Sequence, residues 1–269
     1  MRAGFVGRGL MNLTIGILGF LAARSGSTPE GTSDALERLE GQPWGVAALL
    51  VIALGLLAYG IWRLAAAFWD LEAYGTEAKG MIARAGQTVT GVIHIGLAAV
   101  AAAVVFGSGG SGGGSSIEDW TARIMGWPFG QWIVGIAGAI AAAAGLYYIY
   151  KGISEKYMRM LRSKPLTLRL RPLLTAGLAA QGVVITIIGG LLVYAAWTTN
   201  PQEAGGLGDA FTWLRDQPYG LWLVMALSLG LCAFCVFCLV NAAYRIIPRL
   251  GTDDVETLAS KIEAKAKSA

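Results

Sequence analysis

The sequence predicts an all-α integral membrane protein, a six-helix bundle made of three parallel two-helix repeats with short interfacial helices on the outer side. Three observations support this fold class. Hydrophobic residues make up 55% of the chain and charged residues 14%, whereas soluble domains carry roughly a quarter charged residues. Long uncharged apolar stretches recur along the chain. A Pro-aromatic-Gly triplet opens every second one.

Six segments reach the length of about 20 apolar residues that a hydrocarbon core of about 30 Å requires of a helix. In the first segment the uncharged stretch is short, because Arg8 and Arg24 enclose it. We expect both arginines to snorkel to the two membrane surfaces. A cleaved signal peptide is the alternative for this segment. The six spans are predicted at 4–23, 44–62, 87–106, 129–150, 173–197 and 219–244.

A threefold repeat accounts for all six spans. Arg2-Ala3-Gly4 recurs as Arg84-Ala85-Gly86, and the glycines of the first span recur in the fifth. The first span is thus a counterpart of the third and fifth, which favours its retention over cleavage. Each repeat is expected to be a helical hairpin that enters the membrane from inside and returns to it. The predicted units are repeats 1–81, 82–168 and 169–250, followed by a cytoplasmic amphipathic tail at 251–269 with a helix at 253–267.

Short interfacial helices are predicted on the outer side, before each returning span, where apolar residues recur at helical spacing. Each leads into a triplet whose proline loses no hydrogen bond at a helix start. The aromatic ring is expected to anchor at the headgroups, and the glycine to permit close approach to a neighbour. The helices are predicted at 34–40, 117–125 and 211–215, and the triplets are Pro43-Trp44-Gly45, Pro128-Phe129-Gly130 and Pro218-Tyr219-Gly220.

The distribution of basic residues predicts the orientation of the chain. Seventeen Lys and Arg residues lie at the termini and in the loops 63–86 and 151–171, and four lie in the other loops. The positive-inside rule then places both termini in the cytoplasm, for a multi-pass protein of the plasma (inner) membrane. The net charge of +4 follows from this topology, so no nucleic acid is expected as a partner.

Three polar residues form the candidate intramembrane polar site: His94, Asn12 and Gln181. His94 lies in a stripe of small residues with Gly91 and Ala98, and Asn12 lies in a similar stripe. Small residues let membrane helices approach closely, and an Asn or His among them can hydrogen-bond across the contact. We favour this packing interpretation. Proton or substrate handling is the alternative, since intramembrane ionisable residues are often functional.

Cys232, Cys235 and Cys238 recur every third residue of the last span. We interpret them as small apolar filler. Acylation, redox sensing and metal binding are the alternatives, although a metal site would need a fourth ligand. Walker A, HExxH and GxSxG motifs do not occur in the chain. The sequence therefore predicts no metal, no cofactor and no enzymatic activity, because a single histidine leaves little for acid-base catalysis.

The loop 151–171 holds seven cations and one anion, Glu155. We expect it to contact the anionic lipids of the inner face, where each cation can contribute about 1 kcal/mol. The candidate contacts are Lys156, Arg159, Arg162, Lys164, Arg169 and Arg171.

Several of these motifs resemble those of bacterial membrane proteins built from three repeats of domain-of-unknown-function family 1206. The resemblance covers nearly all of residues 1–250. The family usually has an aromatic residue near the positions of Asn12 and His94, so these two depart from its pattern. The resemblance implies a six-helix fold and a membrane location, and it carries no activity. It rests on Arg2-Ala3-Gly4 with Gly9 and Gly16, Arg84-Ala85-Gly86 with Gly91, Gly177 with Gly182 and Gly189, and the Gln-Pro-aromatic-Gly openings.

Two functional classes remain open from the sequence. The first is a noncatalytic membrane protein that organises lipid or a partner, either another membrane protein or a second copy of itself, through its basic inner loops and tail. The alternative is a small transporter or channel with a pathway between the three repeats, for which His94, Asn12 and Gln181 would be the polar candidates. A redox enzyme is the third and most distant possibility.

Overall fold

The computed structural model describes residues 1–27, 32–106, 117–161 and 165–246. Ten α-helices and two short 3-10 helices make up this part of the chain, and it contains no strand beyond a single bridge between Leu161 and Arg245. The prediction of an all-α fold is confirmed. The tail predicted at 251–269 lies outside the described residues.

Six long helices in the described part are long and apolar enough to cross a membrane. Each overlaps a predicted span, but α4 begins nine residues earlier than the predicted 87. The prediction stopped near the charges at Lys79 and Arg84, whereas the backbone hydrogen bonds of a helix continue past such residues. The six are α1 (Arg2–Ser25), α3 (Gly45–Phe68), α4 (Ala78–Val105), α6 (Gly130–Ile153), α8 (Arg171–Thr198) and α10 (Gly220–Tyr244).

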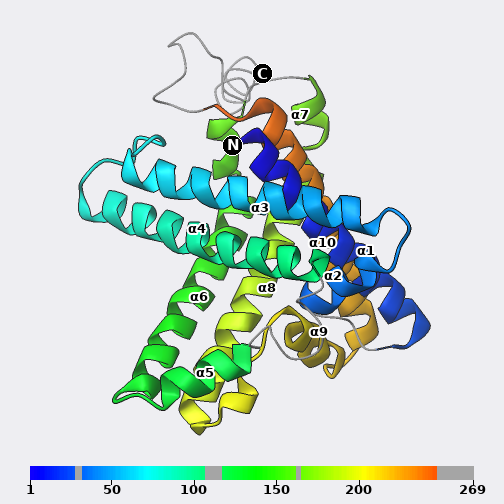
Figure 1. Cartoon of the computed structure of the whole chain (residues 1–269). Coiled ribbons are helices and arrows are strands. Elements are labelled where there is room, and N and C mark those ends of the chain that lie inside the picture. The colour runs from blue at the N-terminus through cyan, green and yellow to red at the C-terminus, as the bar shows by residue number, and fades with distance from the viewer. Residues whose placement is uncertain (28–31, 107–116, 162–164, 247–269) are drawn as a thin grey trace.

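The three short helices predicted before the triplets are present as α2 (Thr32–Glu40), α5 (Ile117–Met125) and α9 (Leu207–Arg215). Figure 1 shows α5 and α9 at one end of the molecule, which we call the outer end. The N-terminus and α7 lie at the opposite end, which we call the inner end because the predicted orientation places it there. Three further short elements were not predicted: η1 (Lys156–Met160), α7 (Pro165–Arg169) and η2 (Pro201–Glu203).

Each triplet forms a tight turn between a short helix and the long helix that follows it. The amide of Gly130 donates to the carbonyl of Trp127 at 2.9 Å, and a Cβ atom there would overlap the carbonyl oxygen of Ile124. Glycine is therefore needed for the fold-back itself. Phe129 and Tyr219 adopt φ of 63°, a left-handed conformation that costs a non-glycine residue about 1 kcal/mol or more.

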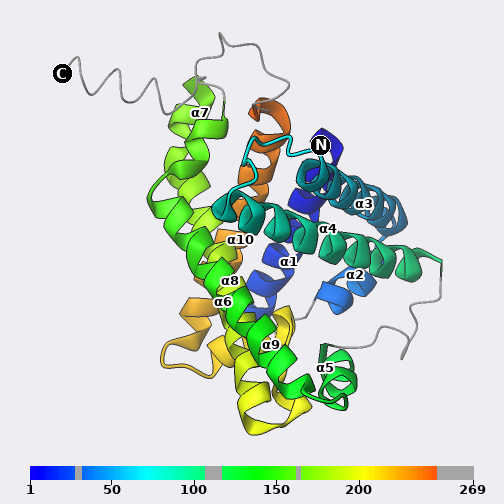
Figure 2. The same cartoon turned by 90° about the vertical axis from the view of Figure 1, so that its left-hand side faces the viewer.

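The closest helix packing joins different repeats: α1 with α10, α3 with α4, and α6 with α8. Within repeats, α1 contacts α3 and α8 contacts α10 less extensively, while α4 and α6 hardly touch. The contacts thus run as an open series, α4, α3, α1, α10, α8 and α6. Figures 1 and 2 show the α3–α4 pair lying across the molecule, at a steep angle to the α6–α8 pair.

The three cysteines of α10 lie opposite the glycines of α1. A Cβ atom added at Gly16 would lie 2.7 Å from Sγ of Cys232, and one added at Gly9 would lie 3.2 Å from Cβ of Cys238. The thiols therefore fill space against glycine, as the filler interpretation predicts.

Candidate functional site

Asn12 and His94 are both buried, and each bonds to its own helix rather than across a helix contact. Nδ2 of Asn12 donates to the carbonyl of Arg8 at 2.9 Å, and Nδ1 of His94 lies 2.8 Å from the carbonyl of Thr90. The prediction of hydrogen bonds across the helix contact is therefore wrong for Nδ2 of Asn12 and Nδ1 of His94. A residue one helical turn earlier offers a carbonyl at the right distance, which satisfies the side chain locally.

Gln181 is half-buried on α8, and its Oε1 atom has no hydrogen-bond partner within the described residues. None of its described contacts joins it to Asn12 or His94. The structure brings a different residue to His94: the ring of Tyr59 lies 4.7 Å from the histidine ring. His94 contacts Tyr59, and Asn12 bonds to Arg8, which itself bonds to Tyr59. Two of the three residues of the predicted polar site therefore lie around this Arg8–Tyr59 pair.

Arg8 does not snorkel to the surface as predicted, because it is only 5% exposed. Its Nη1 donates to the hydroxyl of Tyr59 at 3.0 Å. The guanidinium also lies 5.2 Å from the centre of the Tyr59 ring and 4.8 Å from that of Phe234, distances at which cation–π attraction operates. Aromatic faces from α3 and α10 thus hold the arginine inside the bundle, and Tyr148 of α6 also interacts with it.

Glu72, in the loop after α3, is the centre of a buried ionic network. Its Oε1 lies 2.5 Å from Nη2 of Arg245 and 3.9 Å from Nη1 of Arg63. Its Oε2 accepts bonds from the hydroxyl of Tyr74 at 2.9 Å and from Nε2 of Gln87 at 3.0 Å. Burial alone would raise the pKa of Glu72, but the two guanidiniums and the bond from Tyr74 hold the pKa below its ordinary value.

We call this buried polar region the inner cluster, and it draws residues from all three repeats. Four of its members are cations and one, Glu72, is a carboxylate. Sequence reasoning missed it because it assigned the flanking charges to the membrane surface. The spacing of Tyr59 and Arg63, which puts both on one helix face, was the available signal. The members are Arg8, Tyr59, Arg63, Glu72, Tyr148, Lys151 and Arg245.

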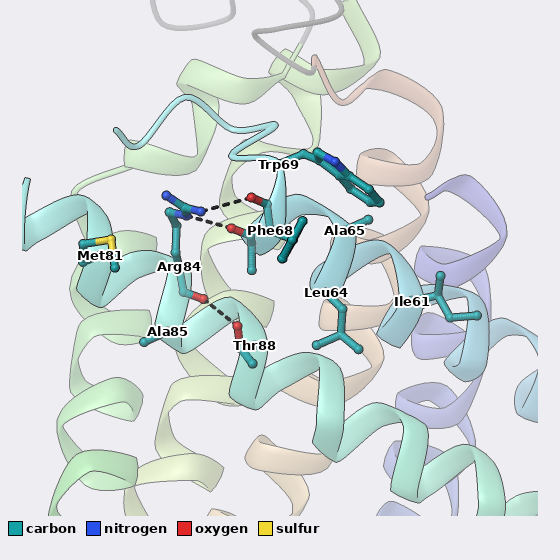
Figure 3. Close-up of a pocket in the computed structure, with 10 residues that line it drawn as sticks. Ile61, Leu64, Ala65, Phe68, Trp69, Met81, Arg84, Ala85 and Thr88 are labelled. Carbon is teal, nitrogen blue, oxygen red and sulfur yellow. Dashed lines mark hydrogen bonds between the residues drawn. The ribbon is translucent and has the colours of Figure 1, made fainter. Parts of the chain in front are cut away.

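A groove of about 620 Å³ lies beside this cluster, between the ends of α3 and α4 nearest their connecting loop. The two helices pack closely at Gly60, where an added Cβ atom would lie 2.8 Å from the carbonyl of Gly91. Toward the loop the groove opens between apolar walls (Figure 3). The walls include Ile61, Leu64, Phe68, Trp69, Met81 and Ala85.

Arg84 is the charged residue among those that line the groove. Its Nε donates to the carbonyl of Ala67 at 2.7 Å, and its Nη2 to that of Phe68 at 3.1 Å. These carbonyls end α3, so the cation also complements the helix dipole. In Figure 3 the remaining nitrogen of the guanidinium points away from both carbonyls. Among the described residues the guanidinium donates no further hydrogen bond.

The predicted anionic-lipid contacts are exposed where the structure describes them. Nζ of Lys156 lies 4.4 Å from the centre of the Tyr150 ring, and Arg171 forms an ion pair with Glu155. Arg162 and Lys164 lie outside the described residues. Lipid contact by this loop stays a prediction. The exposed members are Lys156, Arg159, Arg169 and Arg171.

Comparison with known proteins identifies the family. The model of the Domain of Unknown Function DUF1206 matches three times, at residues 3–70, 85–155 and 176–245. The chain belongs to the DUF1206 family. This DUF1206 chain is also similar to the uncharacterized protein YxxB of Bacillus subtilis (strain 168), at 28% identity over 248 residues that cover 91% of the chain and 90% of that protein. No solved structure matches the chain.

Each DUF1206 match contains two long helices: α1 with α3, α4 with α6, and α8 with α10. The closest packing, by contrast, joins a helix of one match to a helix of another. The DUF1206 unit in this protein is therefore a sequence repeat that completes its packing through its neighbours.

Proposed function

We propose that the protein is a noncatalytic integral membrane protein that binds and organises anionic phospholipid at its inner face. It belongs, in this proposal, to the plasma (inner) membrane, with both termini in the cytoplasm. The observation that carries the proposal is the groove between α3 and α4, which combines apolar walls with the cation Arg84.

The lining of the groove is complementary to a phospholipid. Ligand pockets of roughly 300–1,000 Å³ with mostly apolar walls and few polar groups are typical of small-molecule sites, and this groove falls within that range. An acyl chain would lie against Leu64 and Phe68. The phosphate would lie at Arg84, whose free nitrogen can donate a charge-assisted bond.

The position of the groove along α3 and α4 also supports a phospholipid as its ligand. In the predicted orientation it lies toward the cytoplasmic ends of two membrane-length helices, where we expect anionic headgroups to meet the hydrocarbon. Phe68 and Trp69 are exposed beside it, and tryptophan is enriched at this interface. The exposed cations of the loop 151–171 would add attraction that is less specific than the groove.

The test is the lipid that stays with the purified protein. The protein would be reconstituted with equal parts phosphatidylcholine and phosphatidylglycerol, extracted in mild detergent, and its retained lipids measured by mass spectrometry. We expect enrichment of phosphatidylglycerol in the unmodified protein and its loss in Arg84→Gln. The matched control is Arg2→Gln, which changes the exposed counterpart of Arg84 in the first repeat.

Two results would overturn the proposal. One is equal retention of both lipids by the unmodified protein. The other is an Arg84→Gln variant that is folded, retains its thermal stability and enriches phosphatidylglycerol as strongly as Arg2→Gln does.

A further inference from the structure

The inner cluster contains more positive charge than its own carboxylate can balance. Both oxygens of Glu72 are already occupied, Oε1 mainly by Arg245 and Oε2 by Tyr74 and Gln87. Among the described residues no carboxylate forms an ion pair with Arg8 or Lys151, and Arg63 reaches Glu72 only at 3.9 Å. Arg8 is buried, and Arg63 and Lys151 are partly buried. Cations withdrawn from water without a full counter-ion are expensive, so this excess points to a further anion.

The hydrogen bonds of Arg8 and Arg63 show which of their donors lack a strong partner among the described residues. Arg63 approaches Glu72 only to 3.9 Å, and its buried Nε has no hydrogen-bond partner in the described part of the chain. Arg8 bonds to the neutral hydroxyl of Tyr59 and rests on aromatic faces. Neither arginine has the two-point carboxylate pairing that buried guanidiniums usually make.

The three cations that lack a full counter-ion share one neighbour, the hydroxyl of Tyr148. Arg8, Arg63 and Lys151 all interact electrostatically with the hydroxyl of Tyr148. These residues come from α1, α3 and α6, so the meeting point lies between helices rather than along one helix.

Lys151 brings the cluster to the end of α6. It lies two residues before Ile153, the last residue of this helix, and is only partly buried. The helices α4 and α6 of the second repeat hardly touch. We expect a phosphate group to approach the cluster from this end of α6.

We propose that the inner cluster binds a phosphate group between Arg8, Arg63 and Lys151, with the hydroxyls of Tyr59 and Tyr148 as additional donors. A phosphate fits because it is a tetrahedral oxyanion that accepts bonds from several sides, as three cations on different helices require. The group can belong to free inorganic phosphate or to a lipid headgroup. The site is separate from the groove at Arg84 and does not depend on the lipid proposal.

Thermal unfolding of the purified protein in uncharged detergent, followed by tryptophan fluorescence, tests the proposal. Inorganic phosphate is titrated at constant ionic strength against sodium chloride, because salt alone screens charges. We expect Tm to rise with phosphate and to saturate, as binding to the folded state requires. A parallel arm compares phosphatidic acid with phosphatidylcholine in mixed micelles, and a response there alone assigns the phosphate to a lipid headgroup.

Arg63→Gln should weaken the response about tenfold or more in phosphate concentration, because a charged donor is lost. Lys151→Gln is the second variant, used if Arg63→Gln does not fold. Arg2→Gln is the control and should respond as the unmodified protein does, because Arg2 is exposed and belongs neither to the inner cluster nor to the groove. The proposal is overturned if neither phosphate source raises Tm, or if the folded variants of Arg63 and Lys151 keep the full response.

Discussion

Nη2 of Arg245 lies 2.5 Å from Oε1 of Glu72 and so joins two residues 173 positions apart. Arg245 closes α10, where its Nη1 also donates to Asn241 at 3.0 Å, and its guanidinium lies 5.5 Å from the centre of the Phe5 ring. The loop after α3, the end of α10 and the start of α1 are thus tied together at the inner end.

Loss of this ion pair should destabilise the protein. Glu72→Gln leaves Arg245 buried without its carboxylate, so we expect a loss of about 3 kcal/mol in the free energy of unfolding. The pKa of Glu72 is lowered in the folded state from the ordinary 4.5. The stabilisation is therefore fully present above about pH 4.5 and is lost as the pH falls through the lower folded-state pKa. Unfolding in detergent between pH 3 and 8 measures both effects, with the exposed Glu77→Gln as control.

Two neighbouring glycines of α8 should respond oppositely to alanine. A Cβ atom at Gly189 would lie 2.7 Å from the carbonyl oxygen of Gly138 on α6, so Gly189→Ala should cost about 2 kcal/mol or more. Nothing lies within 4 Å of a Cβ atom at Gly190. Gly190→Ala should therefore be neutral or should stabilise the helix by up to about 1 kcal/mol. Thermal unfolding of the two variants measures these changes in stability. Equal changes in both variants would contradict the observed α6–α8 contact.

The triplet at residues 128–130 offers a separate test of the turn. Gly130→Ala should destabilise α5 against α6, because the methyl group overlaps the carbonyl of Ile124. Phe129→Gly should raise stability in detergent by about 1 kcal/mol, since glycine adopts the positive φ of this residue without strain. If Phe129→Gly instead unfolds the protein in detergent, the ring makes contacts that its exposure does not reveal.

His94 distinguishes a packing role from a transport pathway. Because its Nδ1 bonds within α4 and its ring packs on Tyr59, His94→Leu should lower stability by no more than about 1 kcal/mol. In a variant whose native cysteines are alanine, His94→Cys should stay unlabelled by a membrane-impermeant thiol reagent from the outer solution. Labelling from that side would favour the transporter or channel alternative.

Orientation can be measured with the same reagent on intact cells. Gln202→Cys lies on η2 at the outer end and should be labelled, whereas Arg2→Cys at the inner end should react only after the cells are opened. The reverse pattern would place the basic loops outside and would remove the basis for an inner-leaflet lipid site.

Local patterns in the sequence were enough to predict nine of the ten α-helices in the described residues, all except α7. Apolar length located all six long helices, and helical spacing located the three short ones before each triplet. The opposition of Gly16 and Cys232 was not predicted, although each lies in a stripe of core-type positions. These patterns do not show which residues far apart in the sequence come into contact. Arg8 was assigned to the surface because its position among aromatic side chains depends on Tyr59 and Phe234, which come from two other helices.

The site was predicted less completely than the fold for the same reason. Glu72 is one of several acidic residues in its loop, and nothing local distinguishes it from Glu77. Only the meeting of Arg63, Gln87 and Arg245 around it makes it central. The groove likewise depends on how α3 and α4 diverge beyond Gly60, which a hydropathy pattern does not record.

The pairing of α1 with α10 has a consequence for synthesis of the protein. Of the six long helices described, α1 leaves the ribosome first, and its principal partner, α10, leaves it last. Until α10 is inserted, the glycine-rich face of α1 must lie against lipid or against whatever machinery receives the nascent chain. The first and last translated helices close the assembly together, so a chain that stops after the second repeat should be inserted in the membrane yet remain open to degradation.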